Sequence, residues 1–347
     1  LIAFVLALTI TPLTKMLAKR TGAMSFPNER SVHKKPIPYL GGVSIYLASV
    51  AAIFLIGTVD KATKLSIVFG GLLVLMVGII DDLYTLKPWQ KLLGQFASAV
   101  CVVSFGVDIS FLTDPFSGAI RFTGAIAIPL TIVWVMSFEN VINVSDGLDG
   151  LAAGISGITA LVTVFVSAKA GVPSVSLAAS AIAGSVFGFL PYNFHPASIF
   201  MGDAGAMFLG LALSVLAVQG LVKSAVAMAL FAPILALLVP ISDAAFAIVR
   251  RKATGKPVSR ADHDHIHHRL LEIGLGHKQA VLAIYLVTAV FGALGMFSTF
   301  LPASGGGPIA GLAVIGLIIT GYRIGILTIP SKKRESQSRA QRTRGIK

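Results

Sequence analysis

The chain has 347 residues, of which 55% are hydrophobic and only 12% are charged, and its mean hydropathy is +0.85. A soluble domain of this length does not need so much apolar sequence, so the composition excludes a soluble globular protein and indicates an integral membrane protein. The net charge of +13 does not indicate a nucleic-acid partner, because no soluble domain presents that charge.

Long apolar runs recur along most of the chain. Because a helix needs about 20 apolar residues to cross the hydrocarbon, the sequence predicts about eleven transmembrane helices. They are expected at 1–17, 40–58, 66–80, 91–107, 123–139, 150–167, 175–192, 204–219, 225–245, 280–300 and 308–328. The expected fold class is all-α, a polytopic membrane protein with a single transmembrane domain over residues 1–330. Segment 108–122 favours a small hairpin, because turn-forming residues separate two short apolar stretches.

The distribution of Lys and Arg predicts the orientation, because short cytoplasmic loops carry an excess of them. With the N-terminus outside, only five of the 28 Lys and Arg residues lie on the outer side: Lys61, Lys64, Arg121, Lys169 and Lys223. All seven histidines and most acidic residues then face the cytoplasm, so the working site is expected there. The basic segment 331–347 is predicted to be a disordered cytoplasmic tail that rests on anionic lipid.

Six carboxylates lie at or beside the ends of apolar runs: Asp81, Asp82, Asp146, Asp149, Asp203 and Asp243. An ionised side chain at a bilayer centre costs about 2.5–3.5 kcal/mol on insertion scales, so such residues usually mark function. The adjacent Asp81 and Asp82 would repel each other unless a cation or a shared proton offsets them. They indicate a Mg²⁺ site or a general base, and the alternative is a pair of solvated charges at a helix end.

A second acidic group recurs with a spacing of three residues. Asn143, Asp146 and Asp149 would lie near one face of a helix, and their hard oxygen atoms suit Mg²⁺. The alternative is a polar loop that caps the next span, but a cap needs one such residue rather than three. Asp203 lies at the expected start of a span, so it is a metal ligand or a simple N-cap. Phe200 is a candidate stacking platform for a base or an aromatic residue of the membrane interface.

Four histidines lie between residues 263 and 268, next to Asp262, Asp264 and Arg269. Zinc is not favoured, because the chain has no HExxH pattern and its lone Cys101 lies within a predicted span. A cationic His/Arg cluster that faces a Mg²⁺-carboxylate centre would neutralise the charge of a pyrophosphate group. The alternative is a solvated basic loop. ATP-driven transport is not supported, because the glycines at 274–276 do not have the spacing of a Walker A loop.

Together these motifs resemble the polyprenyl-phosphate N-acetylhexosamine-1-phosphate transferase superfamily, and within it the bacterial undecaprenyl-phosphate N-acetylglucosamine-1-phosphate transferases. The similar segments stand in the family's order at 33–42, 81–82, 143–154, 193–197, 200–203 and 265–269. The resemblance implies a bacterial cell-membrane enzyme of ten or eleven helices with a cytoplasmic active-site cleft, usually a homodimer. Its reaction would be attack of undecaprenyl phosphate on the β-phosphorus of UDP-N-acetylglucosamine (UDP-GlcNAc). The products would be undecaprenyl-diphospho-GlcNAc and UMP, in the first membrane step of teichoic acid or other surface polysaccharide synthesis.

The resemblance also implies roles for individual residues. Asn143 and Asp203 would be ligands of Mg²⁺, with Mn²⁺ as an alternative metal. Asp81 would deprotonate the lipid phosphate with Asp82 beside it, and Asp149 would be a further catalytic residue that organises the nucleotide diphosphate. The substrate-binding residues would be Lys35, Asp146, Phe200, His265, His267, His268 and Arg269.

Two alternatives remain at this point. The branch that uses UDP-MurNAc-pentapeptide typically has three consecutive histidines where this chain has His-Ile-His-His-Arg at 265–269, so Ile266 favours UDP-GlcNAc as the donor. A phospho-MurNAc-pentapeptide transferase is the alternative within the family. A cation- or proton-coupled secondary transporter is the alternative of another class, although its acidic residues would be spread through the membrane depth.

Overall fold

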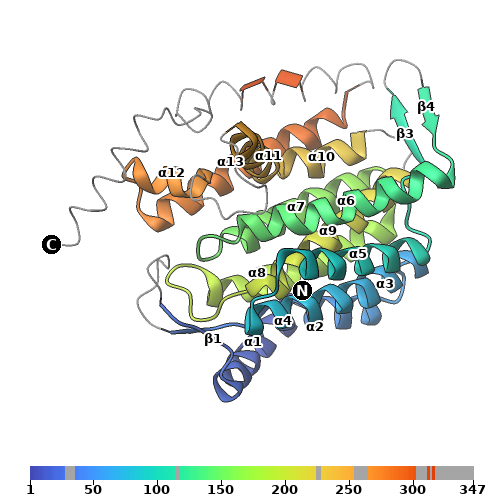
Figure 1. The fold of residues 1–347 in the computed structure, drawn as a ribbon. Coiled ribbons are helices and arrows are strands. Elements are labelled where there is room, and N and C mark those ends of the chain that lie inside the picture. Colours follow the sequence, from blue (N-terminus) through green and yellow to red (C-terminus); the bar gives the residue numbers. More distant parts are fainter. Residues whose placement is uncertain are drawn as a thin grey trace.

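Helix α9 (Gly202–Lys223) forms the centre of a helical bundle, which is drawn in Figure 1. The computed structural model describes residues 1–27, 36–114, 118–223, 228–253, 265–301, 311–312 and 315–316. Within the membrane-length window of α9, 94% is buried inside the protein, against 28% for α1 (Ile2–Thr21) and 33% for α6 (Gly124–Ser145). The chain therefore encloses α9 with helices whose outer faces remain apolar and exposed.

The other helices of the bundle follow the chain in order. They are α1, α2 (Gly41–Ile56), α3 (Lys61–Leu65), the π-helical turn η1 (Ser66–Gly70), α4 (Gly71–Tyr84), α5 (Pro88–Ser104), α6, α7 (Leu151–Lys169), α8 (Pro173–Asn193), α10 (Met228–Ala236), α11 (Leu238–Ala253), α12 (Ile266–Glu272) and α13 (His277–Ser298). Each predicted span from 1–17 to 204–219 coincides with one of these helices or with the continuous segment 61–84, and 280–300 coincides with α13.

The predicted span 225–245 is wrong as a single helix. The described residues there form α10 and α11, which are separated by a turn at Leu237. Pro233 lies within α10 and Pro240 in the first turn of α11. Proline lacks an N–H and clashes with the preceding turn, but it is tolerated where a helix begins, so the break falls between them. Most of the predicted span 308–328, and the tail 331–347, lie outside the described residues.

Seven helical segments of the described chain are long and apolar enough to cross a membrane: Ile2–Thr21, Lys61–Tyr84, Gly124–Ser145, Leu151–Lys169, Pro173–Asn193, Gly202–Gly220 and His277–Ser298. The 16-residue α2 is apolar but shorter. Together these segments make the chain a multi-pass membrane protein, while the total of about eleven spans stays a prediction.

Two short β-hairpins accompany the helices. Strands β1 (Met24–Ser25) and β2 (Ile37–Pro38) pair antiparallel, as do β3 (Phe111–Asp114) and β4 (Gly118–Arg121). The second hairpin confirms the one predicted in segment 108–122. Figure 1 shows β3 and β4 at one end of the bundle and α12 with β1 at the other.

Glycines bring the neighbouring helices close to the start of α9. A β-carbon at Gly78 of α4 would overlap the backbone of Ala204, and one at Gly42 of α2 would overlap the backbone of Gly205. Small residues at such positions allow membrane helices to approach closely. The end of α4 and the beginning of α9 are therefore fixed against each other, backbone to backbone.

Candidate active site

Four helix ends meet in a cluster of polar side chains, here called the carboxylate centre (Asp81, Asp82, Lys91, Asn143 and Asp203). Asp81 and Asp82 lie in the last turn of α4, Lys91 in the first turn of α5, Asn143 in the last turn of α6 and Asp203 in the first turn of α9. Glycine contacts join three of these helices: Gly78 of α4 meets the backbone of Ala204 in α9, and Gly210 of α9 meets the backbone of Glu139 in α6. The predicted metal ligands Asn143 and Asp203 are thus neighbours, next to the predicted base Asp81.

The ammonium group of Lys91 lies at the middle of the carboxylate centre. Its Nζ is 2.9 Å from Asp81 Oδ2, donates a 3.0 Å hydrogen bond to Asn143 Oδ1 and also contacts Asp203 Oδ2. Asn143 Nδ2 in turn donates to Asp203 Oδ1 at 2.8 Å. A single positive charge therefore connects the three residues that were predicted to bind a metal or a proton.

Asp82 has a different role from its neighbour. It accepts hydrogen bonds from the backbone nitrogens of Asp203 at 2.9 Å and Ala204 at 3.4 Å, and so caps α9 from another helix. Gly202 has φ +72°, and a β-carbon there would overlap the carboxylate of Asp82. Because Asp82 caps α9, the side chain of Asp203 is directed instead toward Lys91 and Asn143, which argues against Asp203 as a simple N-cap.

Asp146 directly follows α6 and lies close to the carboxylates of Asp203, Asp82 and Asp149. Burial raises its pKa to about 8, and the charges of Asp203, Asp82 and Asp149 add to this effect. The pKa rises because burial and nearby carboxylates both disfavour the charged form of the Asp146 side chain. A cation would relieve this repulsion. The oxygen atoms of Asn143 and Asp203 that converge on Lys91 are the hard donors that Mg²⁺ prefers, so the residues fit this ion.

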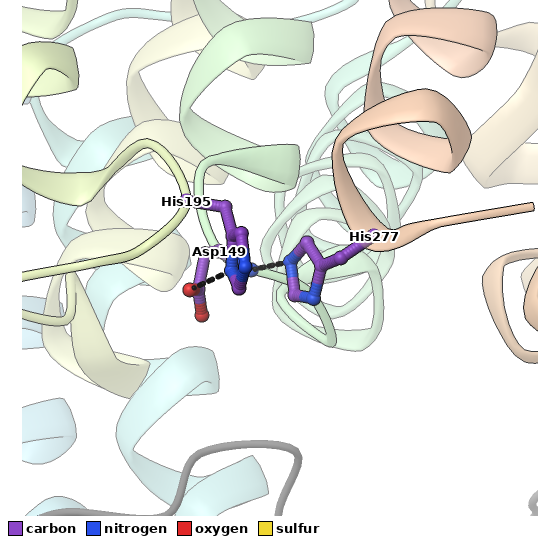
Figure 2. Close-up of side chains that lie close together, drawn as sticks. All are labelled: Asp149, His195 and His277. Atoms are coloured by element: carbon purple, nitrogen blue, oxygen red, sulfur yellow. Dashed lines mark hydrogen bonds and ion pairs between the residues drawn. The ribbon is translucent and has the colours of Figure 1, made fainter.

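A second group of side chains gathers around Asp149, in the turn between α6 and α7. Figure 2 shows Asp149 with His195, from the loop before α9, and His277, the first residue of α13. Asp149 Oδ2 is 2.7 Å from His195 Nδ1 and accepts a hydrogen bond from the backbone nitrogen of Ala197 at 3.0 Å. The backbone nitrogen of Asp149 donates to His277 Nε2 at 3.0 Å, and the two imidazole rings stack with centroids 4.0 Å apart.

The predicted histidine motif forms the short helix α12 and its N-cap. Asp243 of α11, buried at 6% exposure, accepts from His265 Nδ1 at 3.1 Å and from the backbone nitrogen of Ile266 at 3.0 Å. His267 lies against Gly147, because a β-carbon at Gly147 would overlap its ring. This contact places α12 against the turn that carries Asp146 and Asp149. Asp243 thus anchors the motif rather than contributing to the carboxylate centre.

The cationic character expected for the histidine motif does not hold for His267. Burial lowers its pKa to about 3, and the positive charge of His268 contributes in the same direction. His267 is therefore neutral at physiological pH. Its ring centroid lies 4.3 Å from that of His268, and Arg269 pairs with Glu272 at 3.3 Å.

Phe200 lies beside the segment that enters α2. Its backbone nitrogen donates to Pro38 at 2.9 Å, and its carbonyl accepts from Gly41 at 3.0 Å. The Tyr39 ring centroid is 6.2 Å from that of Phe200. Burial raises the pKa of the Tyr39 hydroxyl, and the nearby charges of Asp82 and Asp203 add to the shift. The predicted substrate contact Lys35 lies outside the described residues.

Three residues of this region were not predicted from the sequence: Lys91, His195 and His277. Lys91 is the one cation within the otherwise apolar helix α5, a signal that a search for acidic residues does not detect. His195 lay in the similar segment 193–197 but was given no role, and His277 was noted only as a cytoplasmic histidine. Their meeting with Asp149 depends on the packing of α8 and α13 against α7, which local sequence does not reveal.

The sequence is similar to one family of known proteins. The sequence model described as glycosyl transferase family 4 matches residues 64–221. A Bacillus subtilis (strain 168) protein named "probable undecaprenyl-phosphate N-acetylglucosaminyl 1-phosphate transferase" is 41% identical over 292 residues, 84% of this chain and 81% of the relative. The decaprenyl-phosphate N-acetylglucosaminephosphotransferase of Mycobacterium tuberculosis (strain ATCC 25618 / H37Rv) is 37% identical over 80% of this chain and 77% of its own. The phospho-N-acetylmuramoyl-pentapeptide-transferase of Desulforudis audaxviator is 30% identical over 85% and 94%, respectively.

Proposed function

Because this chain belongs to glycosyl transferase family 4, within the polyprenyl-phosphate N-acetylhexosamine-1-phosphate transferases, we propose that it transfers N-acetylglucosamine 1-phosphate from UDP-GlcNAc to undecaprenyl phosphate. The observation that carries the proposal is the carboxylate centre at the ends of α4, α5, α6 and α9. It lies at the end of a membrane bundle, where a lipid phosphate and a water-soluble nucleotide sugar can meet.

Mg²⁺ binding is part of the proposal. Asn143 and Asp203 would hold the ion, because their side-chain oxygens already converge on the positive charge of Lys91. When bound, a divalent cation supplies charge neutralisation for the diphosphate and orients it. Mn²⁺ has the same preference for carboxylate and carbonyl oxygen and is the alternative metal.

The protein's own residues would position two anions for an in-line displacement. An oxygen of the lipid phosphate attacks the β-phosphorus of UDP-GlcNAc, and the bond from that phosphorus to the bridging oxygen breaks. The electron pair stays on the α-phosphate, which leaves as UMP. Asp81 would accept the proton of the lipid phosphate, held in place by Lys91 and by the backbone nitrogen of Leu86 at 2.7 Å. Such phosphoryl chemistry depends mostly on positioning and charge neutralisation.

The remaining predicted contacts belong to the nucleotide sugar. Phe200 would stack on uracil, and Asp146 and Asp149 would organise the nucleotide diphosphate. Arg269 and the histidines of α12 would lie along the pyrophosphate, with His267 as a neutral hydrogen-bonding group rather than a cation. Catalysis at the cytoplasmic face, a total of about eleven spans and a homodimer complete the proposal, and the charge distribution supports this orientation.

The donor sugar is proposed to be UDP-GlcNAc rather than UDP-MurNAc-pentapeptide. Relatives of both kinds match the chain, but the N-acetylglucosamine-type relatives are 41% and 37% identical, against 30% for the pentapeptide transferase. The interruption of the histidine run by Ile266 supports the same choice. The product would begin a teichoic acid or another surface polysaccharide.

The proposal is tested by incubating the purified protein with undecaprenyl phosphate, Mg²⁺ and one UDP-sugar at a time. We expect UMP and a lipid-linked sugar from UDP-GlcNAc, and loss of both products with EDTA. Turnover of UDP-MurNAc-pentapeptide with UDP-GlcNAc inert would overturn the choice of donor. Cation-driven uptake into proteoliposomes without UMP release would indicate a transporter instead.

A further inference from the structure

Asp149 lies in a group with His195 and His277, two residues that the proposed chemistry does not use as described so far. One ligand-type atom from each of the three side chains can be chosen so that all lie within 4.8 Å of one another. Such a group of one carboxylate and two imidazoles has the composition of a transition-metal site. Its hydrogen bonds and ring geometry assign it a different role.

Two features argue against a shared metal ion in this group. The Nε2 lone pair of His277 accepts the backbone N–H of Asp149 at 3.0 Å, so it is directed at that nitrogen. The rings of His195 and His277 are stacked, with an interplanar angle of 19° and centroids 4.0 Å apart. Imidazole lone pairs lie in the ring plane, so those of two stacked rings run side by side rather than converge on one ion.

The hydrogen bonds instead determine the tautomer of His195. An ionised carboxylate only accepts hydrogen bonds, so His195 Nδ1 carries the proton and donates it to Asp149 Oδ2 at 2.7 Å. The backbone nitrogen of Ala197 donates to the same oxygen at 3.0 Å, and His277 holds the backbone of Asp149. A carboxylate fixed in this way holds an imidazole in one orientation, with the Nε2 lone pair on the opposite edge.

The side chain of His195 is accessible to solvent. It is 33% exposed, against 13% for Asp149. The turn that carries Asp149 also carries Asp146, and the loop that carries His195 leads to Phe200 and Asp203. His195 therefore lies on the loop that leads to the carboxylate centre, next to the turn that carries Asp146 and Asp149.

We propose that His195 is a substrate-contacting residue whose Nε2 accepts a hydrogen bond from an N–H or O–H group of the nucleotide sugar. This deepens the proposed function and rests on it. The ionised phosphates of the donor offer only acceptors, so the partner group lies in the neutral parts of UDP-GlcNAc. These parts offer the uracil N–H, the ribose hydroxyls, the sugar hydroxyls and the acetamide N–H.

The first test compares the wild type with His195→Phe, which keeps a ring for stacking on His277 but removes the acceptor. The KM for UDP-GlcNAc, and its Kd by isothermal titration, should rise about tenfold or more, since a buried polar partner is left unpaired. The KM for undecaprenyl phosphate should stay unchanged. Asp149→Asn, which no longer enforces the tautomer, should raise the same KM. An unchanged Kd for UDP-GlcNAc in His195→Phe would overturn the proposal.

Donor analogues identify the partner group. UDP-glucose lacks the acetamide, a 3-methyluracil analogue lacks the uracil N–H, and a 2′-deoxyribose analogue lacks one hydroxyl. The analogue without the relevant donor should bind the wild type more weakly but should lose nothing further in His195→Phe. If every analogue weakens binding equally in both proteins, the partner is one of the hydroxyls that these analogues keep.

Metal analysis of the purified protein tests whether Asp149, His195 and His277 bind a metal ion instead. One equivalent of zinc in the purified protein, lost in His195→Phe, would overturn the hydrogen-bonded arrangement in favour of a metal site. Failure of the proposed function has a different signature, which is the absence of UMP from wild-type protein with every donor. The titration of UDP-GlcNAc binding to the wild type and His195→Phe still decides the role of His195 in that case.

Discussion

The carboxylate centre and the histidine side of the site (Asp149, His195, His277, Asp243 and α12) are held in place by different means. Asp81, Asp82, Asn143 and Asp203 lie on long helices whose backbones meet at glycines, and Lys91 lies on α5, where Gly94 packs against the side chain of Val77. A substitution at the backbone contacts must separate two helices, because no flexible side chain can move aside.

The histidine side depends on side-chain hydrogen bonds between loops and short elements. Asp243 fixes the start of the seven-residue α12, and Asp149 is linked to His195 and His277. The contact between α12 and the turn after α6 is a ring against Gly147, and a ring can rotate. The carboxylate centre is thus positioned mainly by the packing of helix backbones. The residues of the histidine side, which are assigned to the nucleotide sugar, are positioned by side-chain contacts that can adjust. Substitutions should distinguish the two regions by the size of their effect.

The largest effect is expected from Asp203→Asn. This change removes a carboxylate that contacts Lys91 and Asn143 but keeps the size of the side chain, so turnover should fall about 100-fold or more with the fold intact. Mg²⁺ should raise the thermal unfolding midpoint of the wild type but not of the variant, since a ligand stabilises only the state that binds it. Asp108→Asn, in the loop after α5, is the matched control. Near-normal Mg²⁺-dependent turnover in Asp203→Asn would remove this residue from the site.

Lys91→Met should have the next largest effect. Turnover should fall about tenfold or more, because Asp81 loses the cation 2.9 Å away and the neighbouring carboxylates lose their counter-charge. The Mg²⁺ concentration for half-maximal activity should fall at the same time, since the ammonium no longer competes for Asn143 Oδ1 and Asp203 Oδ2. A Mg²⁺ titration of initial rates measures both quantities. A higher Mg²⁺ requirement would mean that Lys91 supports the metal site instead of competing with the metal.

Paired alanine substitutions at two glycines compare the regions directly. Gly78→Ala should lower turnover and the unfolding midpoint strongly, because its β-carbon meets the backbone of Ala204. Overpacking of this kind typically costs about 1–3 kcal/mol. Gly147→Ala should cost less, because the ring of His267 can move aside, and the double variant Gly147→Ala/His267→Ala should recover part of the loss. Equal losses at both glycines, without recovery, would show that the histidine side is as rigid as the carboxylate centre.

The smallest effect on turnover is expected from His267→Gln, because glutamine keeps a neutral hydrogen-bonding group against the pyrophosphate, and the main change should appear in the pH dependence of stability. The pKa of His267 is about 3 in the folded protein and near 6.5 when unfolded, so the unfolded state binds more protons between these values. Wild-type stability should therefore fall as the pH drops from about 6.5 toward 3, by more than that of His267→Gln. Thermal unfolding measured across this range checks the difference. Identical pH dependence in the two proteins would contradict the neutral, buried state of His267.

The sequence predicted the elements of this fold more reliably than the contacts between them. Apolar runs and their charged ends located the helices that carry Asp81, Asn143 and Asp203, because hydrophobic length and intramembrane carboxylates are local signals. Runs of hydrophobicity do not show where a helix breaks, so the two prolines in 225–245 were not recognised as the boundary between α10 and α11.

Partners across the bundle could not be predicted in the same way. The alternatives left open for Asp203 depended on which residue caps α9, and that residue proved to be Asp82, from another helix. The neutral state of His267 follows from tertiary burial, which a count of histidines and arginines does not register. Lys91 was missed because two of its three partners, Asn143 and Asp203, lie 52 and 112 residues away in the chain.

The most direct test of sugar-phosphate transfer follows the β-phosphorus of the donor. Purified protein would be given UDP-GlcNAc labelled with ³²P at the β-phosphate, together with undecaprenyl phosphate and Mg²⁺, and the lipid and aqueous phases would be separated. Transfer of N-acetylglucosamine 1-phosphate predicts label in the lipid and unlabelled UMP in water, with Asp203→Asn inactive. Label that remains in water as UDP, next to a lipid that has gained only the sugar, would contradict it.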